Sequence, residues 1–137
     1  RQAVFRTRRM NILLDTHIAL WAIADSPRLN AQAKQTILNP KNTIWVSAVS
    51  LWEIAIKHSL GKGDMPVDAK QALSYFQAAG YQILPIYAEH TLAIAELPQH
   101  HQDPFDRLLI AQAMTEPMRL MTHDTQIEKY GNMVLMV

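Results

Sequence analysis

The sequence predicts a single α/β domain with a central, mostly parallel sheet of four or five strands flanked by helices. Short apolar runs typical of buried strands alternate with segments whose apolar residues recur at helical spacing. At 137 residues, the chain is long enough to bury a real core and short for two domains. No repeat, low-complexity tract or linker divides it. Strands that alternate with helices form βαβ units, whose strands are parallel.

The N-terminal half begins with an apolar strand over residues 11–14, followed at once by a helical pattern over 16–24. A second helix is predicted over 30–38, and a proline follows each of these two helices. The β-branched and aromatic run at 43–46 predicts the next strand. This strand leads into a long helix that ends near Gly61.

The C-terminal half continues the same alternation. Asp68 is suited to cap the first helix of this half and Gly80 to end it, while Pro98 ends the second. Apolar and β-branched runs separate the helical patterns. Helices are predicted at 68–79, 89–97, 105–115 and 126–130, and strands at 81–84, 119–122 and 133–137.

Residues 1–9, RQAVFRTRR, are predicted to form an N-terminal extension outside the fold, which leaves 10–137 as the domain. The extension is basic and lacks the apolar centre of a secretory signal. A basic nucleic-acid-binding arm is the alternative interpretation. Residues 1–9 hold four of the 13 basic residues and none of the 12 acidic ones. The domain itself therefore has nine basic and 12 acidic residues, a net charge of −3. A polyanionic substrate would therefore need local positive patches, or metal ions held by acidic residues.

Composition excludes several kinds of site. Without cysteine, the chain has no disulfide framework, thiolate zinc site or cysteine nucleophile. No apolar run approaches the roughly 18 residues of a membrane span. We therefore expect a cytoplasmic protein with no membrane partner.

Two acidic residues follow predicted strands, at the sheet edge where ligands of parallel α/β sheets gather. Asp15 comes directly after the strand at 11–14, and Asp124 lies two residues after the strand at 119–122. Each could instead be a helix N-cap, because a helical pattern follows each one.

Glu53 lies within SLWEIAIK, a helical segment with little polar face. A helix this apolar is expected to be buried on most sides, and a buried carboxylate costs several kcal/mol unless it is paired. The alternative is an exposed pair with Lys57, one helical turn away, which would contribute only about 0.3–0.5 kcal/mol.

The stretch DPFDR holds two acidic residues at the start of the apolar helix at 105–115. Asp103 is suited to be the N-cap, with Pro104 at the first helical position and Asp106 in the first turn. From there Asp106 would project toward the same sheet edge as Asp15. Asp103 is expected to support the site as the cap, and Asp106 to be a metal ligand.

Four carboxylates on one edge would repel one another unless a cation neutralised them. Oxygen ligands without cysteine or a clear histidine set favour Mg²⁺ or Mn²⁺ over Zn²⁺. Such a site suits phosphodiester hydrolysis, since the cation activates a water and stabilises charge on the phosphate. One rival is a haloacid-dehalogenase-like phosphatase, but its second aspartate would stand where the chain has His17.

The ordered motifs LLDTHIALWA, VSAVSLWEIAIK, DPFDRLLIAQA and LMTHD resemble those of the PIN-domain family, and in particular of VapC-type toxins. The resemblance covers the chain from about Met10 onward. It implies a parallel sheet flanked by helices and Mg²⁺- or Mn²⁺-dependent endoribonuclease activity. The family's acidic residues and its supporting hydroxyl residues are implied at Asp15, Glu53, Asp106 and Asp124, and at Thr16, Thr122 and, more weakly, Ser47.

The resemblance also implies partners: an RNA substrate such as tRNA or rRNA, a cognate antitoxin and a second copy in a homodimer. Two alternatives within the family are an RNA-processing nuclease without an antitoxin and a non-catalytic binding module.

Other polar and aromatic residues are weaker candidates, each with an ordinary structural explanation. Histidines 17, 100, 101 and 123 could touch a phosphate or base, but surface or packing roles are expected. Arg107 could reach a phosphate or be solvated. The three tryptophans, at positions 21, 45 and 52, are expected in the core, and most of the methionines in the core or at an interface.

Overall fold

Five parallel strands form the central sheet, in the order β3-β2-β1-β4-β5. The computed structural model describes residues 9–62 and 65–137, so residues 1–8 of the predicted extension lie outside the described residues. The predicted parallel sheet is confirmed, at the upper end of the expected number of strands. The strands are β1 (Asn11–Leu14), β2 (Thr43–Ser47), β3 (Gln82–Leu84), β4 (Arg119–Thr122) and β5 (Val134–Met136).

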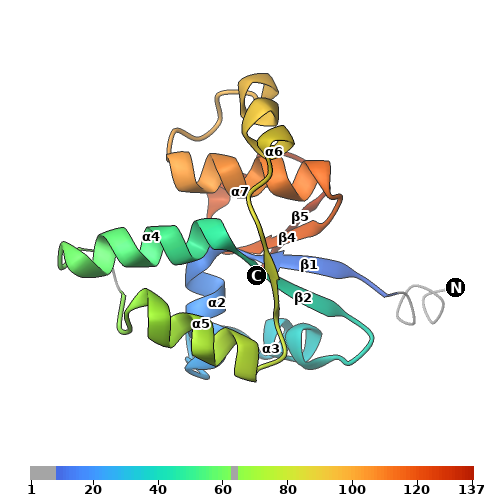
Figure 1. Ribbon diagram of the computed structural model, residues 1–137. Helices are drawn as coiled ribbons and strands as arrows, with labels where there is room; N and C mark the ends of the chain where they lie inside the picture. Colours follow the sequence, from blue (N-terminus) through green and yellow to red (C-terminus); the bar gives the residue numbers. More distant parts are fainter. Residues whose placement is uncertain (1–8, 63–64) are drawn as a thin grey trace, which may run out of the picture.

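The helices lie on both faces of the sheet, as the ribbon in Figure 1 shows. Successive side chains of β1 point to opposite faces, so Ile12 and Leu14 belong to one apolar cluster and Leu13 to the other. Because both faces are covered, the strand is a continuous apolar run. The helices are α2 (Thr16–Ile23), α3 (Ala31–Leu38), α4 (Ala48–Ser59), α5 (Ala69–Ala78), α6 (Ala88–Ala93), α7 (Pro104–Thr115) and α8 (Thr125–Glu128).

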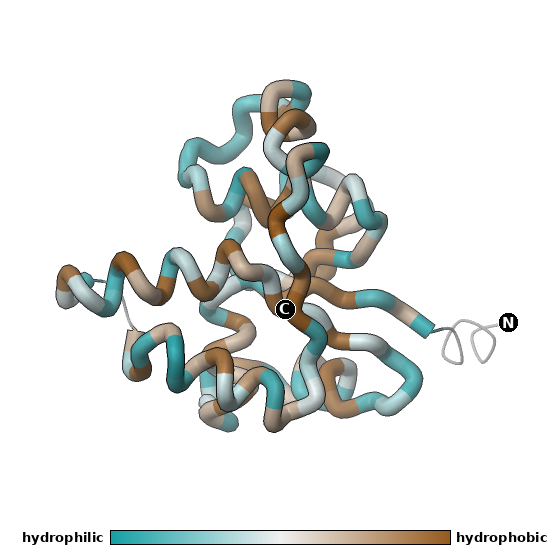
Figure 2. Tube along the Cα trace, viewed as in Figure 1, coloured by the Kyte–Doolittle hydropathy of each residue, from teal (hydrophilic) through white to brown (hydrophobic). Residues whose placement is uncertain are grey.

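The two cores divide the helices between them. Side chains from α2, α3 and α5 pack with Ile12 and Leu14, whereas side chains from α7 and α8 pack with Leu13. Helix α4 contributes to both, through Ile54 on one side and Val49 on the other. Figure 2 shows hydrophobic residues along the sheet and a mostly hydrophilic segment between α6 and α7. The segment that leads into α7 therefore lies at the surface.

Helix ends follow local signals at most positions. Asp68 begins α5 by accepting a hydrogen bond from the backbone of Gln71. Gly80 follows the C-cap at the other end of the same helix, with a φ of +86°. The helix predicted over 89–97 is shorter than expected, because α6 gives way to a 3₁₀ turn (Ile94–Glu96). Within the described residues, no helix is both long and apolar enough to cross a membrane.

Candidate active site

Asp15 combines the two roles that the sequence left open. It directly follows β1 and caps α2, since its Oδ1 accepts a hydrogen bond from the Ile18 amide at 2.9 Å. Its Oδ2 accepts a hydrogen bond from the hydroxyl of Thr122, at the end of β4. Burial raises the pKa of Asp15, although the hydrogen bonds from Thr122 and Ile18 oppose the rise. Asp15 is therefore a helix cap whose carboxylate also belongs to a buried polar cluster.

Glu53 is buried, with a relative exposure of 4%, and both of its oxygens are held. The Thr16 hydroxyl donates to Oε1 at 2.6 Å, and the Lys57 Nζ donates to Oε2 at 2.5 Å. The hydroxyl oxygen of Ser50 lies 2.9 Å from that of Thr16 and extends this network. The pair with Lys57 exists, but it is not the exposed pair of the alternative interpretation.

Lys57 keeps its positive charge in this setting. Burial favours its neutral form, but the hydrogen bond and charge of Glu53, with the charges of Asp103 and Asp106, together raise its pKa. The lysine therefore acts as a fixed cation beside the acidic residues.

Asp103 is the helix cap that its position predicted, and Asp106 lies in the first turn behind it. Asp103 is the N-cap of α7, and its Oδ1 accepts a hydrogen bond from the Asp106 amide at 3.0 Å. Burial raises the pKa of Asp106 to about 7, and the negative charges of Asp103, Asp15 and Glu53 add to the rise. This raised pKa reflects how closely the structure gathers carboxylates around Asp106.

His101 is part of the same cluster, so its assignment to the surface or to packing was wrong. Its Nδ1 accepts a hydrogen bond from the Asp103 amide at 3.1 Å, which places the ring proton on Nε2. That Nε2 lies 2.9 Å from Asp124 Oδ2 and 3.1 Å from Asp106 Oδ2. His101 thus bridges two acidic residues. The only sequence signal for it was its position two residues before a helix cap.

Asp124 contacts Thr122, at the end of β4, in addition to His101. Its amide donates to the Thr122 hydroxyl oxygen at 3.0 Å, and its own Oδ1 caps α8 by accepting from the Gln126 amide. Within the described residues, one group of histidine and carboxylate side chains offers ligand atoms all within 4.8 Å of one another: His101, Asp106 and Asp124.

Ser47 supports the site indirectly. Its hydroxyl accepts from the Val49 amide, at the start of α4, and donates to Gln112 Oε1 on α7 at 2.6 Å. Since α4 carries Glu53 and α7 carries Asp106, this buried bond links the two helices that present these acidic residues.

All four acidic residues that the motifs singled out line one cavity of about 420 Å³. The side chains of Thr16, Lys57 and Asp103 also line it. Trp21, which was expected in the core, is partly buried against the apolar cluster of Ile12 and also lines the cavity. The other residues of the lining are His17, Arg28 and His123.

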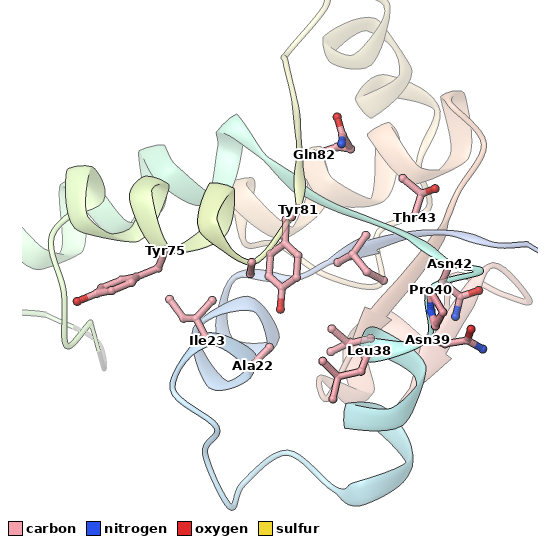
Figure 3. Close-up of a pocket in the computed structure, with 14 residues that line it drawn as sticks. Ala22, Ile23, Leu38, Asn39, Pro40, Asn42, Thr43, Tyr75, Tyr81 and Gln82 are labelled. Carbon is pink, nitrogen blue, oxygen red and sulfur yellow. The ribbon is translucent and has the colours of Figure 1, made fainter.

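A larger hollow, of about 590 Å³, lies elsewhere, between α2, α5 and the segment before β2 (Figure 3). Figure 3 shows the Tyr81 ring directed into it, near Ala22 and Leu38. Burial raises the pKa of Tyr81. The residues that line this hollow, all in the described part of the chain, include no carboxylate, imidazole, amine or guanidinium. Its titratable side chains, within the described residues, are therefore the phenols of Tyr75 and Tyr81.

The sequence left Arg107 open between a phosphate contact and a solvated position. It is partly buried and does not line the cavity, and its guanidinium donates to the carbonyls of Pro98, His101 and Ile94. It thereby orders the segment that carries His101. The prediction that Trp52 lies in the core was wrong, because this residue is 48% exposed and packs edge-on against Phe105, with ring centroids 4.8 Å apart.

Comparisons with known proteins agree with this geometry. The PIN domain family matches residues 12–133. Ribonuclease VapC22 of Mycobacterium tuberculosis (strain ATCC 25618 / H37Rv) is 30% identical over 122 residues, which cover 87% of this chain and 91% of that protein.

Solved structures show the same fold. VapBC2 from Rickettsia felis, bound to a DNA fragment from its promoter, has a TM-score of 0.62 at 22% identity, over 91% of this chain and 96% of that one. A toxin–antitoxin complex from Klebsiella pneumoniae has a TM-score of 0.61 at 20% identity, over 90% and 95%. With the family match and the curated relative, the resemblance read from the motifs is confirmed: the chain belongs to the PIN-domain family, among the VapC-type ribonucleases.

Proposed function

We propose that this chain is an endoribonuclease that hydrolyses RNA phosphodiester bonds with a bound divalent cation, Mg²⁺ or Mn²⁺, and that it acts as the toxin of a toxin–antitoxin pair. The observation that carries the proposal is the convergence of Asp15, Glu53, Asp106 and Asp124 on one cavity at the carboxyl ends of the strands. The relative named as a ribonuclease supports the choice of substrate.

The donor atoms fit a divalent cation. Five carboxylates line the cavity, those of the four proposed ligands and of Asp103. Lys57 contacts Glu53, and His101 contacts Asp106 and Asp124. Burial and mutual repulsion raise the pKa of Asp106 to about 7, and a bound cation would relieve that repulsion. Carboxylate oxygens suit Mg²⁺ and Mn²⁺. His101, whose Nε2 carries the ring proton, holds the carboxylates of Asp106 and Asp124 in place.

The remaining residues hold this site in one arrangement. When bound, the cation supplies Lewis-acid charge that activates water and stabilises negative charge on the phosphate. In the hydrolysis, a water oxygen bonds to phosphorus, the bond from phosphorus to the leaving ribose oxygen breaks, and a proton passes to that oxygen. Thr122 and Thr16 orient the carboxylates of Asp15 and Glu53 beforehand. The Lys57 ammonium adds fixed positive charge beside the phosphate position.

A protein partner is proposed on separate grounds. The relatives from Rickettsia felis and Klebsiella pneumoniae were solved as toxin–antitoxin assemblies. In this chain, Trp52 and Ile56 of α4 and its C-cap residue Leu60 are exposed at four-residue intervals, which gives that helix an apolar outer stripe. Such a stripe suits contact with an antitoxin or with a second copy in a homodimer.

A ribonuclease assay tests the catalytic part of the proposal. Purified protein is expected to cleave RNA with Mg²⁺ or Mn²⁺ and to stop when EDTA is added. Asp15→Asn and Asp106→Asn should each lower the rate by at least 100-fold, because each removes a carboxylate charge from the cation site. Asp68→Asn is the matched control, since it changes an exposed acidic residue and retains a helix cap. Equal cleavage by wild type and both site variants would refute the assignment.

The toxin role is tested in cells. Brief induction should arrest growth and produce new RNA ends, which sequencing maps, and co-expression of a small gene from the same operon should relieve the arrest. Harmless overexpression without such a neighbouring gene would leave a ribonuclease that is not a toxin.

A further inference from the structure

One side of the acidic cavity is lined by an aromatic ring surrounded by cationic or protonatable side chains. The Arg28 guanidinium carbon lies 6.0 Å from the centroid of the Trp21 ring. The His17 ring lies 6.2 Å from the indole at 55°, and the His123 ring 5.9 Å at 66°. All four residues line the same cavity as the acidic residues. We call Trp21, Arg28, His17 and His123 the aromatic rim.

The fold ties the aromatic rim to the acidic cluster. Asp15 caps α2, so His17 lies in the first turn and Trp21 one turn further along the same helix. His123 stands between Thr122 and Asp124, and its Nδ1 donates to the Val137 carbonyl at 2.6 Å. The ring positions are therefore set by the same backbone that positions two of the acidic residues.

Only part of the Trp21 side chain packs against the hydrophobic core. The residue is partly buried, and it packs against the apolar cluster that contains Ile12 and Ile18. Its remaining surface faces a cavity lined mainly by acidic and basic groups. An indole anchored in this way is a rigid, partly exposed aromatic surface, and such surfaces bind nucleobases by stacking.

Charge divides the cavity into two parts. The acidic cluster suits a cation, whereas a phosphate group would be repelled there without one. The aromatic rim carries the Arg28 guanidinium, which attracts a phosphate and can donate hydrogen bonds to it. A nucleotide has a group for each of these partners: a flat base that can stack on the Trp21 ring and an anionic phosphate that Arg28 attracts.

We infer that the aromatic rim is a nucleotide-binding subsite, in which Trp21 stacks on a base next to the scissile phosphate and Arg28 contacts the phosphate backbone. The inference rests on the proposed ribonuclease function and adds to it a binding role for residues outside the acidic cluster. Trp21 thus sets substrate affinity, and the acidic cluster carries the chemistry.

Tryptophan fluorescence tests the subsite without requiring cleavage. The double variant Trp45→Phe, Trp52→Phe leaves Trp21 as the single tryptophan. The matched control Trp21→Phe, Trp52→Phe leaves Trp45, whose Nε1 donates to Asn11 in the neighbouring strand. The probes are the four 5′-ribonucleoside monophosphates, with ribose 5-phosphate as the base-free control. Circular dichroism and thermal melts confirm that each variant folds.

The expected result is saturable quenching of Trp21 by the nucleoside monophosphates, little quenching by ribose 5-phosphate, and no saturable change in the Trp45 control. Equal responses to ribose 5-phosphate and the nucleotides, or no saturable quenching of Trp21, would overturn the stacking role.

Kinetics separate the subsite from the chemistry. Trp21→Leu keeps an apolar side chain in the core but removes the aromatic face. It should raise KM for an oligoribonucleotide by about 5- to 160-fold, the range expected for one lost base–aromatic stack, while kcat falls by less than about threefold. Arg28→Gln should raise KM and weaken its dependence on salt.

The two hypotheses can fail separately. An unchanged KM in a folded, active Trp21→Leu variant would refute the subsite and leave the ribonuclease intact. Nucleotide quenching of Trp21 in a protein that never cleaves RNA would refute the ribonuclease and retain a nucleotide site.

Discussion

The ionisation of Asp106 depends strongly on its neighbours. Its pKa of about 7 has two physical causes, burial and the adjacent carboxylates. Sequence spacing identified the residue, but the size of this effect depends on how closely Asp15 and Glu53 approach it, and those residues are distant in the chain.

The pKa of Asp106 predicts how stability changes with pH in cation-free protein. The folded state binds this proton more tightly than the unfolded state, whose pKa is near 3.8. The free energy of unfolding should therefore fall as pH rises from about 4 to about 7. Asp106→Asn removes this loss and should stabilise the protein by about 1–3 kcal/mol at pH 8, but much less at pH 5. Urea denaturation in EDTA at both pH values measures the difference. An Asp106→Asn effect that is the same at both pH values would contradict the assignment.

Thr122 offers a second prediction at the residue scale. Its hydroxyl donates to Asp15 and accepts from the Asp124 amide, and the residue is fully buried. Thr122→Val should lower the free energy of unfolding by about 1–3 kcal/mol, because it leaves buried polar groups without a partner. Calorimetric titration should also show Mn²⁺ binding about tenfold more weakly, because Asp15 loses its orienting partner.

Thr122→Ser is the control for this prediction, because it keeps the hydroxyl. It should retain most of the cation affinity. If Ser and Val variants bound Mn²⁺ equally weakly, the methyl group and not the hydrogen bond would be responsible.

At the scale of secondary structure elements, the N-caps predicted at Asp68 and Asp103 are confirmed, and Asp15 and Asp124, for which a cap was the alternative interpretation, are caps as well. A cap depends on residues within one turn, so its signal is present in the sequence. The end of α6 was predicted less well, because the 3₁₀ turn after it has no comparable local signal.

The cap of α7 determines where Asp106 points. Asp103→Ala should lower the free energy of unfolding by about 1 kcal/mol and also slow RNA cleavage, because the first turn that carries Asp106 would fray. Asp103→Asn keeps a capping oxygen and removes the charge. It should therefore unfold like wild type in urea. Equal destabilisation by Ala and Asn would show that the charge, and not the cap, stabilises the helix.

At the scale of the whole molecule, the candidate site requires the complete fold. Thr122 and the Asp15 it contacts are 107 positions apart, and Thr16 and Glu53 are 37 apart. The acidic residues are presented by the ends of β1 and β4 and by α4 and α7. The unfolded chain therefore has no cation site.

Cation binding should stabilise the whole domain for this reason. A cation present at 100 times its dissociation constant adds about 2.7 kcal/mol to the free energy of unfolding. The melting temperature of wild type should rise in millimolar Mg²⁺ or Mn²⁺, and that of Asp106→Asn should rise much less. An Asp68→Asn control should respond like wild type. A wild-type melt that is unaffected by both cations would argue against a preformed site.

The order of the elements, their caps and the identities of the four acidic residues could all be read from the amino-acid sequence, because apolar periodicity and capping depend on neighbouring residues. The bridge made by His101, the exposure of Trp21 to the cavity and the contacts of Arg107 with three backbone carbonyls could not. Each of these depends on loop conformation and on how helices pack across the sheet. Those features arise from contacts between residues far apart in the chain, which only the folded arrangement brings together.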